Sequence, residues 1–393
     1  MSNISRATKL LTSEGIDAVL VTSPPNIYYF TQHQNIFPMV SGRYDAVIFL
    51  THESKSVLVV DVEEGIGLFE RPLSVDDIKF FGSFPFCFSD KLTPSELKFK
   101  KAFNKYITSP RTATEAIIQV IKEMGLEKST IGVEKESIPF IIYEKISKAF
   151  PEACFKDVST LLRHIRMIKT DWEVERIKLC SEINEKALKA VIETISVGVS
   201  VWELVKTYLA EVARHKARPL FYLIAAGRNS AHLIPTYRED YRIQDGDIVR
   251  LDVGCEYMGY CSDLSRTVAV GKLDVEKTRL REITVKGYYE VLKNLKPGIP
   301  INKVYAEAMS TVKKVIPDYQ RRHVGHGIGL EVHELPIINS HQTGVLEKNM
   351  VINMETPYLK YGVGGFAAED TVRITDTGVE FITGKYLERL INV

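Results

Sequence analysis

The sequence predicts two domains, an α/β domain over residues 1–158 and an α+β domain over residues 159–393. Its 393 residues are enough for two or three domains at roughly 150 residues each. Short apolar runs alternate with helical patterns through the first half, an order typical of a layered α/β domain. Later in the chain, strand patterns separated by turns follow several helices, as in an α+β domain.

The N-terminal domain alternates predicted strands and helices. Apolar runs predict three buried strands, Ala18–Val21, Ala46–Leu50 and Val57–Val60. Amphipathic patterns predict three helices, Ser5–Glu14, Thr112–Met124 and Ile141–Phe150. The Ser23–Asn26 stretch, with its two prolines, is expected to be a turn. We find no cluster of reactive side chains in this half.

A domain boundary is expected near Asp157–Thr170. Thr170 and Glu173 fit a capping box, in which each side chain accepts a hydrogen bond from the other's backbone N–H. The apolar face that follows predicts a helix continuing to Gly198. Three more helices are expected, Val201–His215, Val275–Leu295 and Lys303–Val315.

Composition and charge exclude several classes of partner. Lys+Arg number 51 and Asp+Glu 50, so no field of one sign is available to hold nucleic acid or an anionic membrane. No apolar stretch approaches the roughly 18 residues of a membrane span, and the first residues lack a secretory-signal pattern. The five cysteines are scattered without a CxxC pair and are expected to be buried thiols. We therefore expect a cytoplasmic protein without nucleic-acid or membrane partners.

The first of two predicted hairpins carries two aspartates. Apolar and polar residues alternate on both sides of Glu256–Gly259. A turn centred on Tyr257-Met258 makes Asp252 and Asp263 direct cross-strand partners, with Cβ atoms about 4.5–5.5 Å apart. Two carboxylates that close repel by about 4 kcal/mol at an effective dielectric constant near 20. A half-buried pair of this kind requires a proton or a cation between the carboxylates.

The second predicted hairpin repeats this arrangement. The strand patterns Val351–Glu355 and Phe366–Val372 flank a glycine-rich bend. A loop centred on Gly362 makes Glu355 and Glu369 cross-strand partners. One acidic residue in a strand usually faces solvent, but two hairpins with acids in register favour a shared site.

A histidine in a glycine-rich segment lies between the hairpins. Glycines at alternate positions around His326 let the backbone approach a ligand and bring its ring inward. His326 and His333 are seven residues apart, which matches neither the HExxH pair of zincins nor a helical i,i+4 pair. A phosphate-binding loop is disfavoured because no P-loop Lys-Ser/Thr follows. A lone histidine on a strand is more often a core residue, but the four acids favour metal ligation by His326.

Four carboxylates and one neutral imidazole carry a charge that two divalent cations balance. Mostly oxygen ligands with one nitrogen suit Mn²⁺ or Co²⁺ first, and Zn²⁺ or Fe²⁺ next. Two such ions close together polarise a carbonyl group and activate water. The implied reaction is hydrolysis of an amide-like bond.

The motifs around these five residues resemble those of the pita-bread metallopeptidases, which include methionine aminopeptidase, aminopeptidase P and prolidase. Asp252 and Asp263 are eleven residues apart, His326 lies in GHGIGLEVHE, Glu355 in NMETP and Glu369 in AAEDTV. The first half, with Asn26–Thr31, resembles the N-terminal domain of the creatinase/prolidase branch, which methionine aminopeptidases lack. The resemblance implies a creatinase/prolidase-type domain over residues 1–158, followed in sequence by a pita-bread catalytic domain over residues 159–393.

The resemblance also implies which metal ion each ligand binds. Asp252 binds one metal ion, and His326 and Glu355 bind the other. Asp263 and Glu369 bridge both ions. Glu355 is in addition the implied proton shuttle.

Two histidines have implied catalytic roles. His333 matches the family histidine that contacts the substrate or stabilises the tetrahedral intermediate. His232 is the nearest match to a second one upstream, and it precedes Asp252 by 20 residues. This spacing implies a longer loop before Tyr241. The remaining histidines, His323 included, are expected to be structural or solvated.

One position departs from the family pattern. Peptidases of this branch commonly have an arginine two residues before the last glutamate, where this chain has Ala367. Arg373 or Arg266 is a possible replacement. Arg321 and Arg322, with His323, are near enough in sequence to hold a substrate carboxylate.

The resemblance implies a two-metal peptidase, commonly a homodimer, that hydrolyses Xaa-Pro bonds in dipeptides or short peptides as prolidase or aminopeptidase P does. Two alternatives stay open. Ala367 and the spacing of His232 also fit a metal-dependent hydrolase of a small non-peptide amide or amidine, similar to ectoine hydrolase or creatinase, although creatinases have lost the metal ligands. The other alternative is a non-catalytic, peptide-binding member of the fold.

Overall fold

The computed structural model describes the chain except for residues 1–2, 35–45, 71–72, 107–110, 236–240 and 385–389. It contains two compact units, Met1–Ile165 and Arg166–Val393. Helix α8 (Ser159–Met167) begins at the first residue of the predicted second domain and ends in the second unit. The exact boundary at residues 158/159 stays a prediction. The loop before Tyr241 lies outside the described residues.

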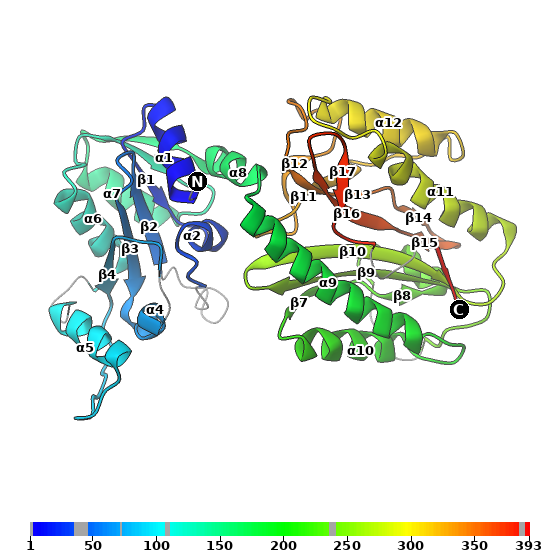
Figure 1. The fold of residues 1–393 in the computed structure, drawn as a ribbon, viewed down its shortest axis with the longest axis horizontal. Coiled ribbons are helices and arrows are strands. Elements are labelled where there is room, and N and C mark those ends of the chain that lie inside the picture. Colours follow the sequence, from blue (N-terminus) through cyan, green and yellow to red (C-terminus); the bar gives the residue numbers. More distant parts are fainter. Residues whose placement is uncertain (1–2, 35–45, 71–72, 107–110, 236–240, 385–389) are drawn as a thin grey trace. The chain divides into compact units, whose positions relative to one another are not determined.

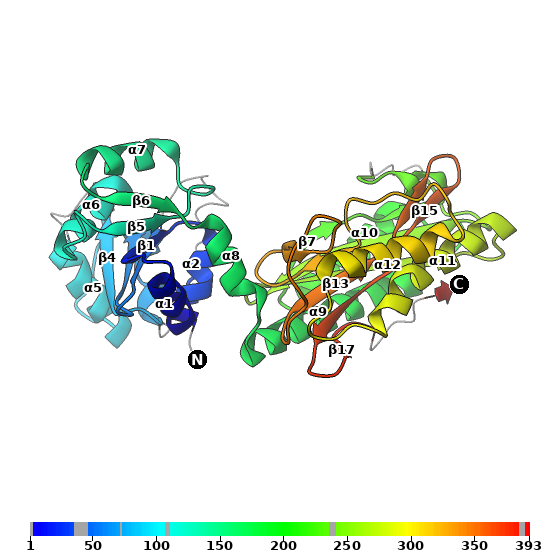
Figure 2. The ribbon, with the colours of Figure 1, turned by 90° about the horizontal axis from the view of Figure 1, so that it is seen from above.

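A six-stranded mixed sheet forms the centre of the first unit, in the order β4-β3-β2-β1-β5-β6 (Figure 1, with β5 and β6 labelled in Figure 2). Its strands are β1 (Ala18–Val21), β2 (Ala46–Thr51), β3 (Ser56–Asp61), β4 (Asp77–Phe81), β5 (Thr130–Val133) and β6 (Cys154–Asp157). Strand β2 is antiparallel to both β1 and β3, and the other neighbours are parallel. The three predicted strands are confirmed.

Helices lie on both faces of this sheet. They are α1 (Asn3–Ser13), α2 (Pro24–Thr31), α4 (Gly67–Glu70), α5 (Pro94–Tyr106), α6 (Ala113–Glu123) and α7 (Phe140–Ala149), with a 3₁₀ turn η1 at Val62–Glu64. Helices α6 and α7 pack into one apolar core with β1, β2 and β3, and α1 and α2 lie on the opposite side (Figure 1). The three predicted helices are confirmed within one or two residues.

The turn expected at Ser23–Asn26 is wrong, because Pro24 opens helix α2. A proline is well suited to the first helical position, where its missing N–H has no intrahelical partner. The buried Glu134 carboxylate supplies the remaining capping, since it accepts hydrogen bonds from the backbone N–H groups of Thr22 and Ser23 at 2.9 and 2.8 Å. This capping contact comes from residues far apart in sequence.

The second unit encloses its strands between two pairs of helices (Figures 1 and 2). The helices are α9 (Asp171–Thr194), α10 (Val201–Arg214), α11 (Val275–Leu292) and α12 (Ile301–Lys313), with a 3₁₀ turn η2 at Gly227–Ala231. Helices α9 and α10 form one core with β9 and β10, whereas α11 and α12 form another with β13 and β16. None of the helices in the described part of the chain is long and apolar enough to cross a membrane.

Three sheets lie between these helices. The first has the order β18-β10-β9-β7, with β8 also paired to β9; the second has the order β12-β11-β13-β16-β17; β14 and β15 form a third. The strands are β7 (Arg218–Tyr222), β8 (Ala225–Ala226), β9 (Ile248–Tyr257), β10 (Tyr260–Ala269), β11 (Gly325–Gly327), β12 (Glu334–Ile337), β13 (Val351–Glu355), β14 (Tyr358–Lys360), β15 (Gly364–Phe366), β16 (Glu369–Ile374), β17 (Val379–Phe381) and β18 (Leu390–Asn392).

The start of α9 was predicted correctly and its end was not. Thr170 and Glu173 form the expected capping box. The helix ends at Thr194, four residues before Gly198. The exit is set by tertiary hydrogen bonds, because the N–H of Gly198 donates to the carbonyl of Ile243 and the N–H of Ile243 donates to that of Val199. These bonds require the chain to leave the helix early.

The register predicted for the first hairpin is wrong. Tyr257 pairs with Tyr260, so Asp252 lies opposite Ser265 and Asp263 lies opposite Gly254. The two-residue turn is Met258-Gly259, whose φ angles are 51° and 82°. Positive φ at both central residues defines the type I′ turn that suits tight hairpins, and glycine adopts it readily. The aspartates are therefore diagonal neighbours on one face rather than direct partners.

The register predicted for the second pair is confirmed. Strands β13 and β16 are antiparallel, with Glu355 directly opposite Glu369. The short strands β14 and β15 continue the same register toward Gly362, which has a φ of 87°. The cysteines are only partly as expected: Cys180, Cys255 and Cys261 are buried, whereas Cys87 and Cys154 are exposed, the latter on edge strand β6.

Candidate metal centre and active site

A cavity of about 710 Å³ opens where the sheets of the second unit meet. Its polar lining contains four carboxylates, three histidines and three arginines: Asp252, Asp263, Glu355, Glu369, His323, His326, His333, Arg250, Arg321 and Arg322. An apolar wall adds Phe221, Leu223, Leu233, Val332, Pro357 and Leu359. All five predicted metal ligands therefore line one cavity, although they come from five strands.

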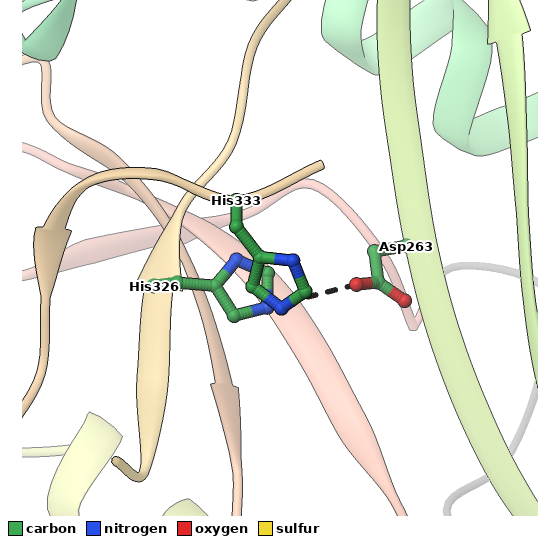
Figure 3. A group of neighbouring side chains, drawn as sticks. All are labelled: Asp263, His326 and His333. Atoms are coloured by element: carbon green, nitrogen blue, oxygen red, sulfur yellow. Dashed lines mark ion pairs between the residues drawn. The ribbon is translucent and has the colours of Figure 1, made fainter. Parts of the chain in front are cut away.

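Two sets of side chains line this cavity, and within each set the potential metal-binding atoms lie within 4.8 Å of one another. Asp252, Asp263 and Glu369 form the first set, and Asp263, His326 and His333 form the second. Figure 3 shows both imidazole rings of the second set beside the Asp263 carboxylate. Asp263 belongs to both sets, which is the position that a bridging ligand of two metal ions requires.

The carboxylates fit a pair of cations. The buried oxygens Oδ1 of Asp263 and Oε1 of Glu369 have no hydrogen-bond partner among the described residues. Burial raises the pKa of Asp263 to about 8 and that of Asp252 to about 6. Burial and the charges of Asp263 and Asp252 raise the pKa of Glu369 well above its usual value. Carboxyl oxygens that are buried and unpaired require a proton or a cation among them, and two divalent ions fit this set of donors.

His326 is held in the form that binds metal. Its Nδ1 donates to the carbonyl oxygen of Gly327 at 3.1 Å, which leaves Nε2 free to accept. Nε2 lies 3.6 Å from Oδ2 of Asp263 (Figure 3). Burial, with the nearby His333, lowers the pKa of His326 to about 3, so the ring is neutral at physiological pH. A neutral ring fixed through its other nitrogen is the usual state of a metal-binding histidine.

Glu355 lies at the edge of the donor sets rather than within them. Its Oε1 accepts a hydrogen bond from Arg321 at 3.0 Å and lies 3.4 Å from Nδ1 of His323. Burial lowers the pKa of His323, although the Glu355 charge opposes this. His323, expected to be structural or solvated yet near enough in sequence to hold a substrate carboxylate, lines the cavity.

The two predicted catalytic histidines occupy different places. The His333 ring lies with its centroid 4.0 Å from that of His326 and 6.0 Å from that of His323. His232 does not line the cavity, and its ring lies 5.6 Å from that of Tyr361. Its carbonyl oxygen accepts a hydrogen bond from Arg250 at 2.6 Å. The structure thus brings His333, but not the ring of His232, to the carboxylates.

Neither arginine considered as a replacement at Ala367 reaches the cavity. Arg373 donates to Asn349 and pairs with Asp171. Arg266 is fully buried and pairs with Asp370 at 2.8 Å, where it holds strand β16 behind the site. Both are therefore excluded as cavity residues.

Arg250 is the cavity arginine that sequence reasoning missed. Its buried guanidinium lies 3.9 Å from the Asp252 carboxylate. Arg250 and Asp252 are two residues apart on β9, so their side chains share one face of the strand. That spacing was readable from the sequence.

Comparison with known proteins assigns the family. Residues 175–376 match the metallopeptidase family M24, and residues 3–168 match the creatinase/prolidase N-terminal domain. The chain belongs to metallopeptidase family M24, with a creatinase/prolidase-type α/β domain followed in sequence by a pita-bread catalytic unit. Membership implies a dinuclear metal site and a peptide substrate.

Relatives resemble this chain over its whole length. An Xaa-Pro dipeptidase of Pyrococcus horikoshii is 28% identical over 383 residues, which cover 97% of this chain and 96% of the relative. The crystal structure of the prolidase from Pyrococcus horikoshii has a TM-score of 0.78 and 26% identity, covering 98% of this chain and 99% of that one. An Xaa-Pro dipeptidase from Bacillus anthracis has a TM-score of 0.81 at 24% identity, covers 100% and 99% of the two chains, and shows the shared fold.

Proposed function

We propose that this protein is a two-metal peptidase that hydrolyses Xaa-Pro bonds in dipeptides or short peptides. The observation that carries this proposal is the convergence of four carboxylates and a neutral imidazole in one cavity of an M24 chain. Full-length similarity to relatives named as Xaa-Pro dipeptidases supports the choice of bond.

Asp252, Asp263, His326, Glu355 and Glu369 would hold two divalent ions, with Mn²⁺ or Co²⁺ expected first because oxygen ligands predominate. When bound, the ions polarise the scissile carbonyl and make a water molecule more acidic. Asp263 is the bridge that geometry supports most strongly, since it belongs to both donor sets. Glu369, from β16, is the second proposed bridge.

Proton transfer and charge stabilisation are assigned to residues at the edge of these sets. Glu355 is the proposed proton carrier; Arg321 donates a hydrogen bond to its Oε1, and Nδ1 of His323 lies 3.4 Å from the same oxygen. His333 would donate a hydrogen bond to the oxyanion that develops on the substrate, and its position in the cavity lining beside His326 supports this role. The His232 ring lies outside the cavity lining, so its proposed catalytic contact would require a different side-chain position.

Arg322 supports a substrate with a free carboxylate close to the scissile bond. It is exposed, lines the cavity and has no ion pair or hydrogen bond among the residues that the structure describes. A guanidinium binds a carboxylate in bidentate fashion. We therefore place dipeptides ahead of longer peptides.

The test is a substrate panel with chelated and metal-reloaded enzyme. It contains Xaa-Pro dipeptides, the same dipeptides with an amidated C-terminus, longer Xaa-Pro peptides, and matched Xaa-Ala dipeptides. We expect turnover of the Xaa-Pro compounds by the reloaded enzyme only, with the free dipeptides turned over best. Turnover of the Xaa-Ala set alone would overturn the proline assignment.

The second candidate is a metal-dependent hydrolase of a small non-peptide amide or amidine. Ala367, which lines the cavity, and the position of His232 favour it. Cleavage of ectoine-like or guanidino compounds without peptide turnover would select it. Peptide binding by calorimetry without any turnover would select the non-catalytic alternative. The homodimer and the cytoplasmic location stay predictions, and light scattering can test the first.

A further inference from the structure

A second charged cluster lies directly behind the segment that carries His333. Glu334, the next residue, is buried and pairs with Lys169 at 2.8 Å; the lysine itself is only 2% exposed. Arg166 lies 3.5 Å from Glu334 and also pairs with Glu331. Lys169 is tied further to its own segment, since its Nζ donates to the carbonyl oxygen of Arg166 at 2.8 Å.

The Glu334 carboxylate also fixes the backbone of the segment. Its Oε1 accepts hydrogen bonds from the backbone N–H groups of Leu330 at 2.9 Å and Glu331 at 3.2 Å. Lys169 binds the other oxygen, Oε2. The segment therefore folds around one carboxylate, and a Cβ atom at Gly329 would lie only 2.7 Å from it. His333 cannot shift along the cavity wall unless Glu334 also moves.

Stability alone does not explain this cluster. A buried ion pair is often no more stable than apolar residues of the same volume, because both charges lose their hydration. The Lys169–Glu334 pair instead fixes the orientation of the Glu334 carboxylate and of the backbone N–H groups that donate to it. Here the group adjoining the pair is His333, an exposed side chain whose ring lies 4.0 Å from that of His326.

We propose that Lys169 and Glu334 are positioning residues that hold His333 at the proposed catalytic centre. This inference rests on the proposed function, in which His333 stabilises charge on the substrate. Lys169 lies far from His333 in sequence and does not line the cavity. It acts through Glu334 and not by touching substrate or metal.

The kinetic test is a double-mutant cycle between Lys169 and His333. Lys169→Met keeps the length of the side chain and removes its charge. We expect kcat to fall about tenfold, with KM and metal content little changed, and we expect this fall to disappear when His333→Ala is already present. Lys169→Arg, which keeps the cation, should recover most of the lost kcat. An equal fall in both backgrounds would overturn the proposal.

Lys178→Met is the matched control. Lys178 lies on α9, pairs with Glu175 and Glu380, and does not line the cavity. We expect its kcat to equal that of the wild type. If Lys169→Met does not fold, the double variant Lys169→Met/Glu334→Gln replaces it in the cycle. That variant leaves no uncompensated buried charge on either residue, and the same outcomes decide the proposal.

A readout without substrate separates this inference from the proposed function. In histidine-labelled protein, NMR identifies the His333 ring signal by its absence from His333→Ala. Lys169→Met should shift or broaden that signal, whereas Lys178→Met should leave it unchanged. A wild-type enzyme inactive on every Xaa-Pro compound would contradict the proposed function alone. An unchanged His333 signal in Lys169→Met would contradict the positioning role.

Discussion

The two pairs of strands that carry the carboxylates differ in how their register is determined. Strands β9 and β10 are joined by the two-residue turn Met258-Gly259, and their aspartates are offset by two residues along the ladder. Strands β13 and β16 are joined through β14 and β15, and their glutamates are directly opposite. Nevertheless Glu369 shares its donor set with Asp252 and Asp263, and Glu355 is bound by Arg321 instead. Pairing within a ladder therefore does not decide which acids meet, because the packing of one sheet on the other does.

The largest effect on metal binding and turnover is expected from removing Asp263, the proposed bridging ligand on strands β9 and β10. In Asp263→Asn the amide cannot supply the second anionic oxygen. The lost attraction between carboxylate and metal, about 4 kcal/mol, corresponds to about a thousandfold in metal affinity. Turnover should fall to background. Glu355→Gln, on the second pair, should lose turnover while retaining more metal, because Glu355 is proposed to hold only one of the two ions. Metal content by elemental analysis, measured together with kcat for both variants, tests this difference. Full metal occupancy in Asp263→Asn would contradict the assignment of Asp263 as a bridging ligand.

A smaller effect is expected from His333→Ala. We expect both metal ions to remain and kcat to fall by about 10²–10³, the usual cost of removing one donor to a developing oxyanion. The place of His333 in a donor set makes metal content the decisive measurement. Loss of one ion per chain would show that His333 is a ligand and not a substrate contact.

Metal removal should lower stability in a pH-dependent way. The pKa values of Asp263, about 8, and Asp252, about 6, lie above the usual 3.8, so the folded metal-free protein binds more protons than the unfolded chain. This contribution to stability is complete below about pH 4 and is lost as the pH rises toward 8. We expect the Tm in EDTA to fall across that range and added Mn²⁺ to raise it by mass action. In EDTA, the Tm of Asp263→Asn should depend less steeply on pH than that of the wild type. An equally steep dependence would exclude Asp263 as the origin of the effect.

The smallest effect concerns the turn that sets the first register. Gly259→Ala places a Cβ atom at a φ of 82° and should cost about 1 kcal/mol of unfolding free energy. Gly362→Ala, at a φ of 87°, is the matched change in the second pair and should cost about the same. Only Gly259→Ala should also weaken metal binding. Its turn joins directly the two strands that carry Asp252 and Asp263, whereas β14 and β15 separate Gly362 from the strands that carry Glu355 and Glu369. Denaturant midpoints and metal titrations of the two variants test the difference.

Local sequence patterns predicted most elements. The apolar runs of β1, β2 and β3 and the capping box at Thr170 were readable because each depends on neighbouring residues only. Two errors arose where distant residues intervened, whereas the register of the first hairpin is set locally by the Met258-Gly259 turn. Glu134 caps a helix at Pro24, and Ile243 ends another before Gly198.

The sequence by itself determined the chemical inventory of the site: four acids and His326 in motifs specific enough to indicate the metallopeptidase family. Only the tertiary structure decided their arrangement. It gave Asp263 two sets of neighbours, bound Glu355 to Arg321, brought Arg250 and His323 into the cavity, and left the His232 ring outside it. The physical reason is that residue type and strand alternation are local properties, whereas distances between strands of different sheets depend on how the whole unit packs.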